Sequence, residues 1–108
     1  MAAHLGEFEQ LVLLALIQLG DEGYGISVRD EIHRRTGRDP AFATVYTTLT
    51  RLADKGLITS RLGEPTAERG GRRKKYYAIL PAGRRAIQAS LHALRGMSHG
   101  LDTSWGTP

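Results

Sequence analysis

The chain has 108 residues, of which 41% are hydrophobic and 24% are charged, and its net charge is +4. This length allows one domain with a small core and leaves no room for a second. The absence of cysteine excludes disulfides, thiol catalysis and cysteine-ligated zinc. The longest apolar run, residues 11–17, is far shorter than the roughly 20 residues that span a membrane. The acidic start at Glu7 and Glu9 differs from a signal peptide, so we expect a cytoplasmic protein with no membrane partner.

Charge is divided unevenly along the chain. Residues 1–40 hold four Arg against seven Asp or Glu, a net charge of −3, whereas residues 41–108 hold eleven Lys or Arg against four acids, a net charge of +7. A basic half in a chain with a pI near 9.9 suits a polyanionic partner. A soluble basic protein with no polyanionic partner would have the same charge. The charge therefore indicates a polyanionic partner only if the fold places the cations together on a binding surface.

Residues 5–19 predict a first helix, because they lack proline and place apolar side chains at positions 8, 11, 12, 15 and 19. Further apolar residues fill most of the remaining circumference. A helix that is apolar nearly all round must be covered on several sides. We expect its own domain to cover one side and a second copy of the chain to cover the other, through Leu13, Leu16 and Ile17. The glycines at 20 and 23 end this helix.

A second helix, residues 25–35, and a third, residues 42–55, are joined by a short turn, as in a helix-turn-helix. Val28 and Ile32 form the buried face of the second helix, and Gly37 stops it with a positive φ. Asp39 can cap the third helix, with Pro40 at its first position.

The third helix has the clearest pattern in the chain, a continuous apolar stripe formed by Phe42, Val45, Tyr46, Leu49, Leu52 and Ala53. The opposite face is expected to carry polar side chains, with Ala43 and Thr50 at its margins: Thr44, Thr47, Thr48, Arg51 and Lys55. Helix propensity does not explain so many threonines, because Thr is a mediocre helix former. Hydroxyls and guanidinium groups reach phosphates and base edges, so we interpret this helix as a DNA recognition helix that also uses Thr50. Threonines that are merely tolerated on a solvated surface are the alternative.

Residues 57–62 and 75–80 predict two strands of a hairpin, which we call the wing. Its tip carries five cations within seven residues: Arg69, Arg72, Arg73, Lys74 and Lys75. Like charges this close repel one another unless an anion neutralises them, so we expect the first four to meet DNA phosphates. A flexible solvated loop is the alternative. Tyr76 and Tyr77 alternate along the second strand, so one ring should pack in the core and the other should face outward.

The last helix is predicted to run from residue 81 or 82 to about residue 97. Ile87, Leu91 and Leu94 step by four and three, which makes a narrow heptad-like seam. This seam is too short to be stable alone, so we expect it to dimerise by packing on the first helix of a second copy; packing on its own domain alone is the alternative. A two-fold dimer would place two recognition helices about 34 Å apart and read a pseudo-palindrome.

The predicted fold class is therefore mainly α with a small β-hairpin. We expect residues 1–80 to form a winged helix-turn-helix domain that binds DNA, and residues 81–98 to add a C-terminal dimerisation helix. Residues 99–108 are expected to be a flexible tail.

Four sequence blocks, in this order, resemble the PadR family of bacterial transcriptional regulators, in the short form without a large C-terminal domain. They are LGEFEQLVLLALIQLG at 5–20, GYGISV at 23–28, ATVYTTLTRLADKGLI at 43–58 and GRRKKYYAILPAGRRAI at 71–87. The resemblance covers about residues 5–95. It implies a winged-helix homodimer whose recognition helix contacts DNA through Tyr46 and whose last helix dimerises. It also implies a small hydrophobic aromatic effector between the dimer halves, in a pocket formed by the first and last helices, and we expect a repressor.

The chain departs from the family at residue 80, where Leu80 replaces the Thr that caps the last helix. A missing cap costs about 1 kcal/mol, and it concerns the start of that helix rather than the fold.

Two other functions compete with DNA binding. The four histidines, at 4, 33, 92 and 99, have no partners at metal-ligand spacing, and no phosphate loop or nucleophile motif occurs. We therefore expect no enzyme, no metal and no cofactor. A winged helix that binds protein or RNA is the stronger alternative, because a fold does not determine its function. The cationic wing and the Thr-rich helix favour duplex DNA.

Overall fold

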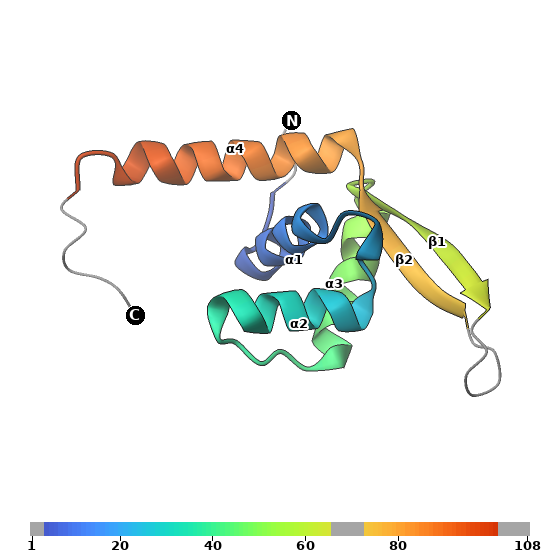
Figure 1. Cartoon of the computed structure of the whole chain (residues 1–108). Coiled ribbons are helices and arrows are strands. Elements are labelled where there is room, and N and C mark those ends of the chain that lie inside the picture. The colour runs from blue at the N-terminus through green and yellow to red at the C-terminus, as the bar shows by residue number, and fades with distance from the viewer. Residues whose placement is uncertain (1–3, 66–72, 102–108) are drawn as a thin grey trace.

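The computed structural model describes residues 4–65 and 73–101, and it arranges them as three helices, a hairpin and a final helix (Figure 1). The expected wing residues Arg69 and Arg72, and most of the expected tail, lie outside the described residues. The elements in chain order are α1 (Glu7–Leu19), the short 3₁₀ helix η1 (Gly20–Glu22), α2 (Gly25–Thr36), α3 (Phe42–Asp54), β1 (Ile58–Pro65), β2 (Arg73–Ile79) and α4 (Pro81–Ser98). This order confirms the predicted winged helix-turn-helix with an added C-terminal helix.

Helix α1 begins where a side chain satisfies a free backbone donor. The Glu9 carboxylate accepts a hydrogen bond from the Gly6 N–H at 2.8 Å, which is the half of a capping box that the third helical residue supplies. The helix ends at Gly20, whose φ of +58° few other residues adopt readily and whose N–H donates to the Leu16 carbonyl.

The turn between α2 and α3 is held by Arg29. Gly37 adopts the expected positive φ, +76°, and donates its N–H to the His33 carbonyl. The expectation that Asp39 caps α3 is wrong, because the helix begins at Phe42 after Ala41, without a side-chain cap. Asp39 forms an ion pair with Arg29 instead, and the Arg29 Nε–H donates to the Pro40 carbonyl at 2.8 Å. The turn is therefore fixed from α2 rather than from the start of α3.

The two wing strands pair antiparallel in a register that runs from Ile58 opposite Ile79 to Leu62 opposite Lys75. The segment before α2 adds a third short pairing. Tyr24 bridges Tyr76, and the Tyr77 N–H donates to the Gly23 carbonyl at 2.7 Å. The main chain thus attaches the wing directly to the helix-turn-helix.

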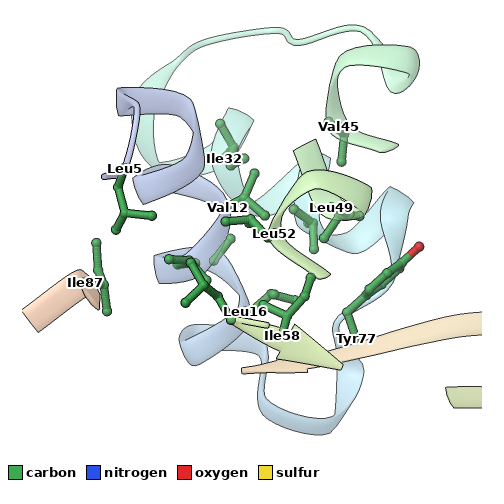
Figure 2. Close-up of a cluster of buried hydrophobic side chains, with 14 of the residues drawn as sticks. Leu5, Val12, Leu16, Ile32, Val45, Leu49, Leu52, Ile58, Tyr77 and Ile87 are labelled. Atoms are coloured by element: carbon green, nitrogen blue, oxygen red, sulfur yellow. The ribbon is translucent and has the colours of Figure 1, made fainter. Parts of the chain in front are cut away.

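The core lies where α1, α2, α3, the base of the wing and the start of α4 meet (Figure 2). Its largest fully buried side chains come from all three first helices and from α4: Leu13, Leu49, Leu52, Ile87, Val12, Val28 and Val45. The Tyr77 ring joins this core, whereas the Tyr76 ring lies half-buried, which confirms that the two rings take opposite faces.

Helix α4 packs on the domain only through its first half. Its buried residues are Gly83, Ala86 and Ile87, and every described residue from 92 onward is exposed. In Figure 1 the second half of α4 extends beyond the other helices. The helix starts at Pro81, whose fixed φ suits the first helical position, and Leu80 provides no side-chain cap. Within the described ranges, no helix is long and apolar enough to cross a membrane.

The two glycines of α4 differ in the space around them, and one of them lies against the chain just before the wing. A Cβ on Gly83 would lie 2.3 Å from the Leu57 carbonyl oxygen, whereas a Cβ on Gly96 would meet nothing within 4 Å. We expect Gly83→Ala to lower the free energy of unfolding by about 1–3 kcal/mol through overpacking. Gly96→Ala, the matched control, should raise it by up to about 1 kcal/mol through helix propensity. Urea unfolding followed by circular dichroism measures both, and equal stabilities would contradict this packing.

Candidate nucleic-acid interface

Helix α3 turns a polar surface away from the core because its apolar stripe is buried. Val45, Leu49 and Leu52 are fully buried, which leaves Thr44, Thr47, Thr50 and Arg51 exposed. A shallow hollow of about 280 Å³ runs along this surface beside Thr44, Thr47 and Arg51. Hydroxyl and guanidinium groups therefore line one accessible helix face, as expected.

Thr48 does not belong to that exposed face, so its expected placement is wrong. Its side chain is only 4% exposed, and its hydroxyl donates to the Thr44 carbonyl at 2.8 Å. The reason is helical geometry, because residue 48 lies one turn from both Val45 and Leu52 and so falls on their side of the helix. Thr48 thus donates its hydroxyl proton within α3, and its nearly buried side chain lines the hollow without joining the exposed face.

Two members of the apolar stripe emerge at the surface, since Phe42 and Tyr46 are each 45% exposed. The Arg29 guanidinium lies over the Phe42 ring, 4.9 Å from its centroid. The Tyr46 hydroxyl packs against Gly25, where a Cβ would lie only 2.4 Å away. The absence of a side chain at Gly25 is therefore what allows the Tyr46 ring to lie across the start of α2.

Lys55 also lies apart from the expected interface. Its ammonium donates to both carboxylate oxygens of Glu9, at 2.8 and 3.0 Å, and to the His4 carbonyl at 3.0 Å. Burial opposes ionisation of Glu9, but hydrogen bonds from Lys55 and from the Gly6 N–H outweigh it and lower the pKa of the Glu9 carboxyl below 4.5. Lys55 thus joins the end of α3 to the start of α1 and is not free for an external anion.

The described part of the wing places three cations beside α3. Arg73, Lys74 and Lys75 are exposed on β2, and with Tyr46 and the first turn of α2 they line a cleft of about 420 Å³. Positive charge and the exposed edge of α3 therefore face the same space, which suits a polyanion.

The six residues expected to form a dimer interface differ in how far they are buried within their own domain. Leu13, Leu16 and Ile87 are at most 2% exposed within their own domain, so they have no surface for a second copy. Ile17 and Leu91 are half-buried, and Leu94 is 59% exposed. Two further apolar side chains, Met97 and Leu101, are exposed beyond Leu94. The free apolar surface of α4 is therefore its second half.

Sequence reasoning missed three residues that shape this site: Tyr24, Arg29 and Phe42. Phe42 was assigned to the buried stripe, although a position at the first turn of a helix has fewer neighbours to cover it. Tyr24 and Arg29 act through ring stacking and turn geometry, which have no periodic signal. The only hint in the sequence was the GYGISV block that contains Tyr24.

The ion pair between the buried Glu9 and Lys55 makes stability depend on pH. Because the pKa of Glu9 is lowered on folding, its contribution is present above about pH 4.5 and is lost as the pH falls through the folded pKa. We expect Lys55→Met to lower the free energy of unfolding near neutral pH and to match the original chain at acidic pH.

The matched control is Arg38→Met, which removes an exposed ion pair to Glu7 and should change stability little. Urea unfolding at several pH values measures both variants. A Lys55→Met deficit that stays constant across the acidic range would rule out this role for Glu9.

Comparisons with known proteins agree with this geometry. The sequence model of the transcriptional regulator PadR-like family matches residues 13–89. A PadR family transcription regulator from hypervirulent Clostridium difficile superposes with a TM-score of 0.73 at 24% identity, over 86% of this chain and 92% of that chain. A transcriptional regulator from Clostridium thermocellum gives a TM-score of 0.71 at 25% identity, over 91% and 92% of the two chains.

Bacillus subtilis PadR, solved in complex with operator DNA, gives a TM-score of 0.65 at 22% identity, over 78% of this chain and 46% of that chain. No curated protein matches the chain. The family match extends over more than half of the sequence, from within α1 to within α4. The chain therefore belongs to the PadR-like family of transcriptional regulators, which is a family of regulators and not of enzymes.

Proposed function

We propose that this protein binds duplex DNA sequence-specifically and regulates transcription as a homodimer on a pseudo-palindromic operator. The observation that carries the proposal is the polar face of α3, where Thr44, Thr47 and Arg51 lie exposed beside the cations of β2. Among the described residues, the Arg51 side chain makes no hydrogen bond or ion pair. Its guanidinium therefore keeps its donors for phosphate or for a guanine edge.

The distribution of the ion pairs supports this proposal. Within the described ranges, the carboxylates of α1 and α2 pair with cations of α2, of the turn that follows it and of the end of α3, as in Glu31 with Arg34 and Arg35. Arg35 and Arg34 donate to Glu31 and lower the pKa of its carboxyl despite burial. Among the residues that the structure describes, no carboxylate pairs with Arg51 or with the cations of β2. The operator complex of Bacillus subtilis PadR is a precedent for DNA binding on this fold.

A dimer would supply the second recognition helix that a pseudo-palindrome needs. The surface that supports it is the second half of α4, where Leu94 and Met97 are 59% and 82% exposed. Apolar side chains along a helix without cover are typical of an interface. The half-buried Leu11, Leu14 and Ile17 on α1 offer the matching apolar surface on a second copy.

Repression, and its relief by a small aromatic effector, stay predictions of the family resemblance. The pocket was expected between the first and last helices. The cavity that supports a ligand of this kind lies between α1 and α2 instead. It has a volume of about 250 Å³ and is lined by Leu11, Leu14, Ile32 and the stems of polar neighbours.

A random duplex library selected on the protein tests the DNA proposal. We expect an enriched pseudo-palindrome and binding that weakens steeply with salt, because each phosphate contact releases a counterion. Arg51→Ala should weaken binding to the selected site by about ten-fold or more. Arg84→Ala, an exposed arginine on α4, is the matched control and should bind as the original chain does. If no duplex binds at low salt, or if protein or RNA binds instead, the proposal is wrong.

Leu94→Asp tests the dimer. Its side chain is exposed, so the substitution leaves the core intact and places a charge in the proposed interface. Light scattering should give about 11.8 kDa for this variant and twice that mass for the original chain. Ala89→Asp, an exposed position on the opposite side of α4, should remain dimeric. A Leu94→Asp dimer would place the interface elsewhere.

A further inference from the structure

The wing and the start of α2 carry a row of four side chains in which two cations flank two aromatic rings. The Lys74 ammonium lies 4.5 Å from the centroid of the Tyr24 ring. The Tyr24 and Tyr76 rings meet edge to face, with centroids 5.5 Å apart and planes at 71°. The Arg61 guanidinium lies over the Tyr76 ring at 4.7 Å. The row begins at the start of α2, crosses β2 and ends on β1.

The backbone holds both rings in place. Tyr24 bridges Tyr76 through the main chain, and its N–H donates to the Ser27 hydroxyl at 2.9 Å. The Tyr76 ring occupies the space above Gly63, where a Cβ would lie 2.6 Å from a ring carbon. A side chain at Gly63 would push this ring away from Tyr24. The two rings are therefore fixed in place. The Tyr24 ring restrains the long side chain of Lys74, which lies over it.

A ring restrains a lysine differently from a carboxylate. A carboxylate fixes an ammonium but cancels its charge, as Glu9 does for Lys55. A ring face attracts the cation through its quadrupole and leaves the full charge in place. Within the described part of the chain, neither Lys74 nor Arg61 has a carboxylate partner. Lys74 is also exposed and lines the cleft shared with Tyr46 and the start of α2.

We propose that Tyr24 is a positioning residue that holds the charged Lys74 ammonium at the cleft between the wing and α2, ready for a DNA phosphate. This inference rests on the proposed duplex-DNA binding and adds a residue that touches no DNA itself. Preorganisation is the physical gain, because a restrained side chain loses less entropy when the phosphate arrives than a free lysine does.

A double-mutant cycle on the selected operator tests the coupling, with Tyr24→Leu and Lys74→Met as the two changes. Tyr24→Leu should weaken binding roughly three-fold, the range of a cation–π contact at an exposed site, and Lys74→Met should weaken it at least as much because it also removes the phosphate contact. The double variant should bind no more weakly than Lys74→Met alone, because Tyr24 acts only through Lys74. Additive losses, or unchanged binding by Tyr24→Leu, would overturn the proposal.

Two further replacements separate the ring's charge distribution from its packing and remain informative if Tyr24→Leu does not fold. Tyr24→Phe keeps the ring and should bind as the original chain does. Pentafluorophenylalanine at position 24 keeps a similar shape but reverses the quadrupole, so it should match the loss of Tyr24→Leu. Equal binding by these two aromatic variants would mean that Tyr24 is only a packing residue and would overturn the inference.

A measurement without DNA distinguishes this inference from the proposed function. In the free protein, the ring current of Tyr24 should shift the ε-methylene proton signals of Lys74 upfield, and Tyr24→Leu should return them to the position of a free lysine. Unshifted signals in the original chain would overturn the positioning role even where operator binding is found. If the shift is present but no duplex binds, the proposed function fails and the phosphate role fails with it.

Discussion

Three parts of the chain meet at Gly23, and the geometry of the candidate interface depends on this junction. A Cβ at this position would lie 2.7 Å from a methyl carbon of Leu16 and 3.2 Å from the Tyr77 carbonyl oxygen, so a side chain here would displace Leu16 and crowd β2. The Gly23 carbonyl accepts the Tyr77 N–H, and α2 starts two residues later. One main-chain contact thereby fixes the wing relative to both the core and the start of the helix-turn-helix. The distance between the cations of β2 and the exposed face of α3 follows from it.

The uneven charge of the sequence has a structural explanation. The acidic first part of the chain does not form a separate acidic surface, because several of its carboxylates are used in ion pairs within the helical body. Glu9 and Glu31 are buried, which opposes their ionisation, but hydrogen bonds from their cations outweigh that burial and lower the pKa of both carboxyls. Cations of α2, of the turn after it and of the end of α3 are thus neutralised, whereas Arg51 and the cations of β2 have no carboxylate partner within residues 4–65 and 73–101.

Much of the fold was predictable from the sequence, because periodicity and glycine positions are local signals. The stripe of α3, the stop at Gly37 and the two strands were found within a few residues of their observed bounds. The errors arose where a residue's partner is distant in sequence. In the sequence, Lys55 looks like a free cation, because its contact with Glu9 joins residues far apart in the chain. Asp39 looks like a helix cap for the same reason, because its ion pair with Arg29 is not visible in the sequence.

Burial was harder to predict at the edges of a pattern than at its centre. Thr48 was expected outside and is buried, whereas Phe42 was expected inside and is exposed. The residues expected to form the dimer interface show the same difficulty. An apolar side chain such as Leu13 can pack in its own core or against a second copy, and the sequence does not distinguish the two.

The cations of the wing have a consequence for how ionic strength acts on the protein. The two paired strands hold Arg61, Arg73, Lys74 and Lys75 close together, and aromatic rings lie against Arg61, Lys74 and Lys75. Their mutual repulsion opposes the folded hairpin, and dissolved salt weakens that repulsion by screening. The same salt weakens attraction to a polyanion. The ionic strength that best preserves the free hairpin is therefore not the one at which it holds DNA most tightly, and the bound polyanion replaces salt as the source of counter-charge.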